Sequence, residues 1–390
     1  MRIRRCAVVM IESRERLGFD PGLLPQGGTG IRSTIEWVAL APHLDGESEL
    51  TPADLVVLGE VSPTLWLSLE SLVELHSLEA VEELLRKGLL VGEGTDVDKR
   101  DRVLRSVHWR PAAAVMHYGS RWQGVDTEDV TNRFVDSFEG ELLDRLGPPP
   151  APVLERVDAA ERLALPRPTA TPFDQLLGRR VTCRNFDPSQ KLTTAQFSSV
   201  MYRAFGARVV NEHVPGFRVL KKAVPSAGAL HPTEAYVLVQ RVDGIAPGLF
   251  HYHPVDHALE PIQTMSVEEA VMLANRLVAS QGYFSDAHAM VFPTSRFQRQ
   301  SWKYRNHAKA YRALILDIGH ISQTLYLAAT ELGLGAFITA AINEVDIEEA
   351  FGLDSLEEAP LAVCGFGVRA ATCEEMEFDP LNMVWPASIE

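Results

Sequence analysis

The chain has 390 residues, 46% of them hydrophobic, and a formal net charge of −15. This length exceeds one ordinary core and predicts two domains, and the acidity argues against a general nucleic-acid binder, because neutralising phosphates requires a basic face. No apolar run approaches the roughly 20 residues of a membrane span, and the 4 cysteines lack a CxxC pair, which is typical of a cytoplasmic protein without a disulfide framework or zinc knuckle.

The sequence pattern over residues 1–147 predicts an N-terminal winged-helix-like domain. Residues 78–91 read as an amphipathic helix, ended by Gly88, and a following strand. An earlier helix over roughly residues 63–76 would complete a helix-turn-helix with a β wing, and residues 109–122 predict a helix that closes the domain. Because this half carries many acids, docking of a peptide or protein is favoured over DNA binding, and a purely structural role is equally open.

A proline-rich stretch separates this domain from the rest of the chain. The seven prolines between residues 148 and 172 exclude a regular helix or central strand and predict a linker. Helices are then expected near residues 173–177, 194–205, 267–280 and 306–332, and strands at 235–241, 249–253, 289–293, 336–341 and 361–368. Helices and strands mixed in this way predict that residues 173–390 form an α+β domain, a mixed sheet flanked by helices.

The helix expected after Tyr304 is apolar nearly all round. Tyr311, Ile318 and Leu325 repeat every seven residues, and further apolar residues lie on other faces. A helix of this kind is buried in a large core or between subunits. We interpret it as a long central dimer helix that ends at Gly333.

Three segments carry candidate binding residues. In the first, Arg180, Thr182 and Arg184 alternate, so that on an extended chain all three side chains point one way. Two guanidinium groups and a hydroxyl can hold a phosphate, because arginine donates hydrogen bonds in a planar fork. The alternative is a solvated basic turn.

The second and third segments are rich in small residues, which let the backbone approach a flat or anionic ligand. The second is the loop 225–232, with Pro225, Ser226, Ala227, Gly228 and Leu230, followed by a short strand. The third is a turn after the long helix, with Gly333, Leu334 and Gly335. Each also has a simple structural alternative, a strand-entry turn for the second and a helix stop for the third.

In combination these segments resemble the nitroreductase superfamily of FMN enzymes, and more narrowly its SagB/McbC-type dehydrogenases, which mature ribosomal peptides. The resemblance covers about residues 173–370. Thr182 stands where the family usually has Ser, and Val181 where a second Arg is common. Further matching motifs are the hairpin at residues 250–254 with His257 and Leu259, and the helix residues Lys303, Tyr304, Tyr311, Arg312, Gly319, His320, Leu327 and Ala329.

The resemblance implies an FMN site at a homodimer interface. Arg180, Thr182 and Arg184, together with Arg369, would hold the phosphate. The loop residues Pro225, Ser226, Ala227, Gly228 and Leu230 would lie near the isoalloxazine, and Gly333, Leu334 and Gly335 would close the other side. No metal is expected, because His251, His253 and His257 lack a carboxylate or Cys to complete a ligand set.

The resemblance also places catalysis on the adjacent pair Lys303 and Tyr304. Oxidising a thiazoline or oxazoline to an azole removes a proton from one ring carbon and a hydride from another. The proton needs a base, and a tyrosine beside an ammonium group could be that base. Since consecutive residues on a helix diverge by about 100°, we expect the pair in a loop or irregular turn just before the long helix.

The sequence is compatible with three functions. The first is azoline oxidation on a precursor peptide, in company with a cyclodehydratase or other maturation enzymes. The second is a flavin reductase, driven by a reduced nicotinamide, that acts on dehydroamino acids or nitroaromatics. The third is a flavin-bound scaffold whose N-terminal domain docks the precursor peptide.

Overall fold

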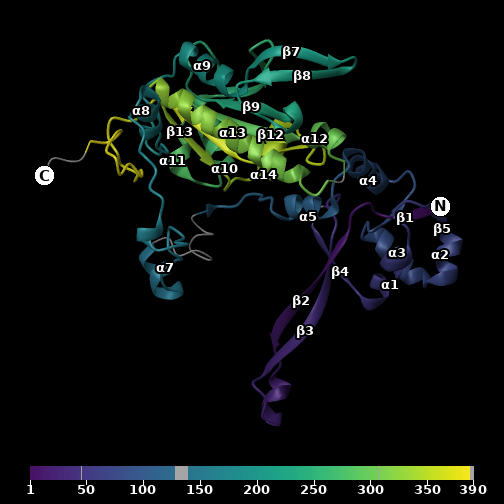
Figure 1. Cartoon of the computed structure of the whole chain (residues 1–390). Helices are drawn as coiled ribbons and strands as arrows, with labels where there is room; N and C mark the ends of the chain where they lie inside the picture. The colour runs from purple at the N-terminus through teal and green to yellow at the C-terminus, as the bar shows by residue number, and fades with distance from the viewer. Residues whose placement is uncertain (45, 128–138, 306, 387–390) are drawn as a thin grey trace. The chain divides into compact units, whose positions relative to one another are not determined.

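The computed structural model describes residues 1–44, 46–127, 139–305 and 307–386 (Figure 1). They fold into two compact units that are discontinuous in sequence. The first unit comprises residues 1–121, 296–314 and 353–359, and the second comprises the other described residues. That residues 1–147 form a domain by themselves, joined by residues 148–172 to a domain of residues 173–390, stays a prediction.

The first unit combines short helices with two small antiparallel sheets, of strand order β5-β1-β6 and β2-β3-β4. Thr51, Ser68, Ser77 and Thr95 start helices α1 to α4, because each side chain accepts a hydrogen bond from the backbone N–H three residues later. Its strands are β1 (Arg2–Arg5), β2 (Met10–Phe19), β3 (Ile31–Leu40), β4 (Glu47–Leu50), β5 (Leu67–Ser68) and β6 (Leu90–Gly92). Its helices are the 3-10 turn η1 (Pro21–Gln26), α1 (Pro52–Glu60), α2 (Leu69–Leu75), α3 (Leu78–Arg86), α4 (Asp96–Val107), α5 (Pro111–Gly119) and α12 (Phe297–Lys303).

The helix and strand predicted over residues 78–91 are confirmed as α3 and β6. Val81 and Leu84 of α3 are fully buried in the core of this unit. Gly88 has a φ of 71°, the left-handed conformation that ends helices and that glycine adopts without strain. The helix predicted over residues 63–76 is shorter, since α2 covers only Leu69–Leu75. The winged-helix interpretation itself stays a prediction.

The proline-rich stretch is exposed throughout residues 148–171. Within it the structure contains only the short 3-10 turn η2 (Ala159–Glu161). It follows α7 (Glu139–Leu146) and leads to α8 (Pro172–Gly178), whose capping box joins Thr171 and Asp174.

The second unit is built on an antiparallel sheet of strand order β11-β10-β9-β12-β15-β13. The long strand β12 (Ala289–Arg296) lies between β9 (Thr233–Val239) and β15 (Val363–Gly367), and seven of its eight residues are buried. The other strands are β10 (Gly248–His253), β11 (Ala258–Thr264) and β13 (Gly335–Thr339), with a separate hairpin of β7 (Ala207–Val214) and β8 (Phe217–Lys222). The short strand β14 (Glu358–Pro360) begins in the segment 353–359 of the first unit.

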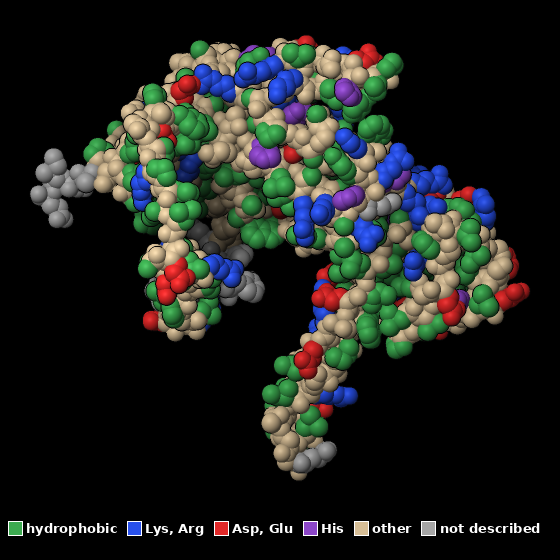
Figure 2. Space-filling view, in the orientation of Figure 1, with side chains coloured by type: hydrophobic (Ala, Val, Ile, Leu, Met, Phe, Trp, Pro, Cys, Tyr) green, Lys and Arg blue, Asp and Glu red, His purple; other side chains and the backbone are tan. Residues whose placement is uncertain are grey.

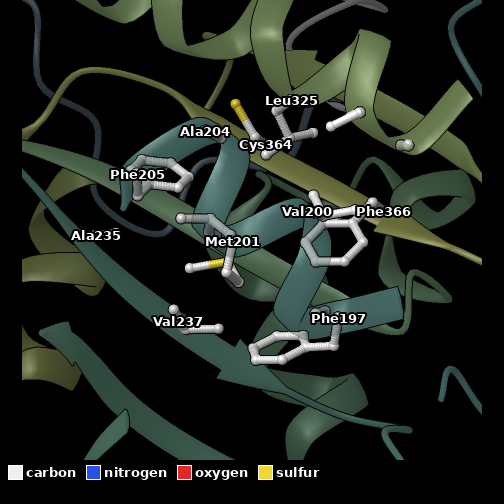
Figure 3. Close-up of a cluster of buried hydrophobic side chains, with 14 of the residues drawn as sticks. Phe197, Val200, Met201, Ala204, Phe205, Ala235, Val237, Leu325, Cys364 and Phe366 are labelled. Atoms are coloured by element: carbon white, nitrogen blue, oxygen red, sulfur yellow. The ribbon is translucent and has the colours of Figure 1, made fainter. Parts of the chain in front are cut away.

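The core of this unit lies between the sheet and two helices, α9 (Thr194–Phe205) and α13 (Ala310–Glu331). Figure 3 shows Phe197 and Val200 of α9 close to Phe366 of β15, with Leu325 of α13 above Cys364. Apolar residues at helical spacing on α9 make this packing possible. The remaining helices are the 3-10 turn η3 (Ala227–Ala229), α10 (Val267–Leu277), α11 (Gly282–Ser285) and α14 (Glu344–Phe351). The predicted α+β class is confirmed.

Within the second unit, the apolar seam of α13 faces the core. Ile321 and Leu325 are 5% and 0% exposed, whereas Ile315 and Leu316 on the opposite side are 49% and 62% exposed. An apolar pair left in solvent is compatible with the predicted dimer role, which stays a prediction. None of the described helices is long and apolar enough to cross a bilayer.

Candidate functional site

The first predicted segment runs alongside β13. Thr182 forms an isolated parallel bridge with Ala336, and the backbone N–H of Cys183 donates to the Ala336 carbonyl at 2.8 Å. This approach requires a glycine at position 335, since a Cβ there would lie 2.3 Å from the Cys183 sulfur. Gly335 is therefore needed for the packing of two backbone segments.

Arg180 and Thr182 meet at Tyr326 of α13. The Thr182 and Tyr326 hydroxyls are 2.9 Å apart, and the Arg180 guanidinium lies 5.2 Å from the centroid of the Tyr326 ring. The backbone N–H of Ile338 donates to the same phenol oxygen at 3.1 Å. Burial raises the pKa of Tyr326, so its hydroxyl remains a neutral hydrogen-bonding group. Sequence reasoning missed Tyr326, because its partners lie in distant segments.

Arg184 and Arg369 are brought together by a residue that sequence reasoning also missed, Glu377. Its buried carboxylate accepts hydrogen bonds from the Arg184 backbone N–H at 2.6 Å and from the Arg369 guanidinium. It also accepts from Asn185, through backbone and side chain, and from the Trp385 indole at 2.8 Å. The Arg184 guanidinium itself donates to the Met376 carbonyl at 3.1 Å.

This network explains the charge state of Glu377. Burial alone would raise the pKa of its carboxyl, but the hydrogen bonds from Trp385, Arg184 and Asn185, with the positive charge of Arg369, outweigh burial and hold that pKa below its usual value. The ionised Glu377 thus neutralises Arg369. The prediction that Arg369 holds a phosphate would require this ion pair to open.

The second predicted segment is tied to α13 by Asp317. The Ser226 hydroxyl donates to the Asp317 carboxylate at 2.5 Å, and the Ala227 N–H donates to its other oxygen at 3.3 Å. The Ser226 oxygen in turn accepts from the His231 N–H at 3.0 Å. Asp317 is 4% exposed, and burial raises its pKa while the bonds from Ser226 and Ala227 oppose that shift.

The same loop holds a strained backbone. Gly228, Ala229 and His231 have φ values of 61°, 57° and 46°. A glycine adopts this region freely, but each of the other two residues is held there at a cost of about 1 kcal/mol or more. The bonds to Asp317 and Ser226 offset that cost, and strain of this kind is typical of loops that contact a ligand.

The third predicted segment ends α13. Gly333 has a φ of 72° with nothing near its missing side chain, and the Leu334 N–H donates to the Ala329 carbonyl at 2.9 Å. These are the features of a helix C-terminus. The geometry of Gly333 is therefore explained by the helix stop, and a ligand-binding role for Gly333 and Leu334 stays a prediction.

Lys303 and Tyr304 lie in the first unit. Lys303 is the last residue of α12, and Tyr304 caps that helix with a non-helical φ of −108° and ψ of 45°, ahead of the start of α13 at Ala310. Lys303 therefore lies on a helix, and only Tyr304 begins the irregular turn that was expected for both residues. The Lys303 ammonium nitrogen is 5.7 Å from the centroid of the Tyr304 ring, so the two side chains do turn toward each other.

An aromatic cluster supports this turn. Trp109 packs on Phe297 of α12 with a centroid separation of 4.4 Å, and Tyr304 helps to line a cavity of about 30 Å³ beside both rings. The Tyr311 hydroxyl lies 3.0 Å from His117. Burial lowers the pKa of His117 to about 3, so this histidine is neutral and belongs to the packing.

Two histidines of the predicted hairpin, His251 and His257, contact nearby carboxylates or hydroxyls. The two ring nitrogens of His251 approach Glu260 at 2.6 Å and Glu234 at 3.5 Å, and His257 lies between the Tyr252 and Ser198 hydroxyls. The carboxylate of Glu234, opposed by burial and assisted by Glu260, raises the pKa of His251. In the described part of the chain no group of three or more His, Cys, Asp or Glu residues could hold a metal ion.

Comparison with known proteins places these residues in context. Residues 177–368 match the nitroreductase family. A nitroreductase-family protein of Methanocaldococcus jannaschii is 30% identical over 195 residues, which cover 50% of this chain and 90% of that protein. The trifolitoxin-processing protein TfxB of Rhizobium leguminosarum bv. trifolii is 34% identical over 167 residues, 41% of this chain and 43% of TfxB. The microcin B17-processing protein McbC of Escherichia coli is 25% identical over 190 residues, 47% of this chain and 65% of McbC.

We predict that Asp317→Ala loosens the loop after Pro225. The change leaves the Ser226 hydroxyl and the Ala227 N–H without their acceptor, which costs about 1–3 kcal/mol of unfolding free energy. Urea unfolding measures this loss, and amide exchange of residues 227–231 should accelerate. Gln323→Ala, on the exposed side of the same helix, should change stability by no more than about 0.5 kcal/mol. Unchanged exchange in the loop would refute the assignment of Asp317.

We predict that Glu377→Gln destabilises the second unit in a pH-dependent way. Loss of the charge leaves Arg369, whose side chain is only 13% exposed, without a counter-ion, at a cost of about 3 kcal/mol near neutral pH. Because the pKa of Glu377 is held below its ordinary 4.5, its contribution is present above that ordinary value and is lost as pH falls through the lowered pKa.

Urea unfolding at neutral and acid pH measures this difference. The gap in unfolding free energy between the wild-type protein and Glu377→Gln should narrow on acidification. Glu374→Gln, at an exposed carboxyl of the same segment, is the matched control and should show little effect at either pH. A gap that stays constant from neutral to acid pH would contradict the assignment of an ionised Glu377.

Proposed function

Because the chain belongs to the nitroreductase family of oxidoreductases, we propose that it is an FMN-dependent dehydrogenase that oxidises azoline rings in a ribosomal precursor peptide. The predicted resemblance to the SagB/McbC-type members of this superfamily is confirmed, since two of the relatives are the trifolitoxin- and microcin B17-processing proteins. The observation that supports a peptide substrate is this pair of relatives. As the chain spans 43% and 65% of their lengths, their activity is carried over only as a proposal.

The residues around Tyr326 fit the phosphate of FMN. In the described part of the chain the Arg180 guanidinium pairs with no carboxylate, and the Thr182 hydroxyl lies beside the same ring. A free guanidinium and a hydroxyl held in one place are the donors that a phosphate requires. Arg369 fits less well, because Glu377 already accepts its hydrogen bond. We assign Arg180 and Thr182 to the phosphate, with Arg184 beside them, and a positioning role to Arg369.

FMN, when bound, would supply the acceptor for the hydride that leaves the ring. The chain's own contribution is the base. Tyr304 would take the ring proton at its phenol oxygen, and the ammonium nitrogen of Lys303 lies 5.7 Å from the centroid of the Tyr304 ring. The loop of Ser226, held by Asp317, and the turn of Gly333 to Gly335 would confine the flavin ring and exclude water.

Further parts of the proposal concern partners. Ile315 and Leu316, exposed on α13, would form a homodimer interface, and the predicted N-terminal domain of residues 1–147 would dock the precursor peptide or a cyclodehydratase. A second candidate function is favoured by the Methanocaldococcus jannaschii relative, which aligns over 90% of its length. It is reduction of nitroaromatics or dehydroamino acids with a reduced nicotinamide as donor.

Purification with a visible spectrum and identification of the released chromophore tests the cofactor first. Bound FMN and the conversion of a thiazoline peptide to a product lighter by two hydrogen atoms would support the dehydrogenase. Consumption of a reduced nicotinamide with a nitroaromatic, and no reaction with the azoline, would favour the second candidate. A colourless protein that does not take up FMN would overturn both, and would leave a docking role for the N-terminal domain without a bound flavin.

We predict that Arg180→Ala weakens FMN binding about 10- to 100-fold, as expected for the loss of a charged hydrogen bond. The dissociation constant is measured by quenching of flavin fluorescence. Arg179→Ala removes an exposed guanidinium one residue away and should leave the constant within about twofold. Equal weakening by both variants would show that the positive charge of the segment, and not Arg180, binds the phosphate.

We predict that Tyr304→Phe and Lys303→Ala lower the rate of azoline oxidation by about 100-fold or more, because each removes part of the base. FMN content should be unchanged, since neither residue is assigned to the cofactor. Arg305→Ala, at the exposed next position, serves as the control. Full activity in both variants would contradict the assignment of the base.

A further inference from the structure

The strands β2 and β3 form a long two-stranded ribbon with two unlike faces. Ten residues of β2 pair with ten of β3 without a register shift, and only residues 37–40 of β3 pair further, with β4. Since cross-strand partners point the same way, Phe19 with Ile31 and Glu15 with Ile35 lie on one face, whereas Arg14 with Glu36 lies on the other. Figure 1 shows the two strands side by side, running away from the helices of their own unit.

The charged face of the ribbon is satisfied within the chain. Arg14 pairs with Glu12 at 2.7 Å and with Glu47 at 2.6 Å. Arg16 pairs with Glu36 at 2.9 Å, and Arg32 lies 3.6 Å from Asp20. Each arginine of this face thus has an acidic partner, so the ribbon offers neither a membrane surface nor an acidic peptide a patch of unbalanced positive charge.

The other face is apolar and open to solvent. Leu17, Phe19, Ile31 and Ile35 are 65%, 72%, 58% and 60% exposed. Its ionisable residue is Glu15, whose carboxylate accepts a hydrogen bond from the Ser33 hydroxyl of the same face at 2.5 Å. Hydrophobic side chains are visible along the ribbon, beside charged ones, in Figure 2. An isolated two-stranded ribbon is only marginally stable in water, so this face needs a cover.

The area of this apolar face and the symmetry of a contact between identical chains indicate that a second copy of the chain covers it. The four side chains expose roughly 500 Å² of apolar surface, a large part of the ~800 Å² that each partner contributes to a standard protein interface. A two-fold axis between two facing ribbons brings the same face of each copy into contact, so two copies can stack apolar side chains on apolar side chains while the paired charges stay in water.

We propose that the apolar face of the β2–β3 ribbon, formed by Leu17, Phe19, Ile31 and Ile35, is an interface between two copies of this chain. The two ribbons stack face to face as a small four-stranded sandwich. This contact is separate from the dimer role proposed for α13, because the residues concerned lie on different elements. The proposal does not depend on catalysis or on FMN.

The mass of the full-length protein in solution, from light scattering or sedimentation, tests the interface. The double variant Leu17→Lys/Phe19→Lys should halve the mass of the wild-type assembly, since each copy brings two charges into the apolar contact. Thr34→Lys adds a charge on the opposite face of the same ribbon and should leave the mass unchanged. An unchanged mass in the double variant overturns the proposal. So does loss of precursor-peptide binding without a change in mass, because the face would then be a peptide site.

A cross-linking pair keeps the proposal testable if the double variant folds poorly. In a Cys373→Ser background, Ser33→Cys places a thiol on the apolar face and Thr34→Cys places one on the charged face. Oxidation should join two copies through Ser33→Cys only. Cross-linking through neither, or equally through both, would show that the ribbons do not stack by this face.

Discussion

A buried carboxylate must find hydrogen-bond donors, and in this protein that requirement holds the candidate site together. The Asp317 carboxylate accepts hydrogen bonds from the Ser226 hydroxyl and the Ala227 N–H, and the Glu377 carboxylate accepts hydrogen bonds from three separate segments. An ionised group deprived of such partners would cost several kcal/mol. The loop after Pro225 and the segment after β15 that carries Arg369 are therefore fixed by two acids that stand outside the predicted motifs.

These acids divide the predicted binding residues into groups with different roles. Arg180 and Thr182 lie beside Tyr326, where their side chains can donate hydrogen bonds to a ligand. The charge of Arg369, in contrast, is neutralised by its ion pair with Glu377. A motif in the sequence does not distinguish the two kinds of arginine, because both are basic residues outside a helix or strand. Their partners decide which of them can take an anion and which holds the scaffold.

The first unit shows a comparable division between packing and exposed surface. Trp109 and Phe297 join helices from distant parts of the chain and support the turn of Tyr304. The β2–β3 ribbon, in contrast, leaves its apolar face outside any core. The aromatic packing accounts for the position of α12, whereas the apolar face of the ribbon requires a partner that covers it.

The sequence by itself determined the local and repetitive features. Short-range patterns and propensities predict the apolar face of α3, the end of that helix at Gly88, the core strands of the second unit and the family resemblance. The structure and the comparisons confirm these features. Only the tertiary structure decided the partners of Asp317, Tyr326 and Glu377, and the two faces of the β2–β3 ribbon. Such contacts join residues that are up to 193 positions apart, and no local pattern encodes which distant donor reaches a given oxygen.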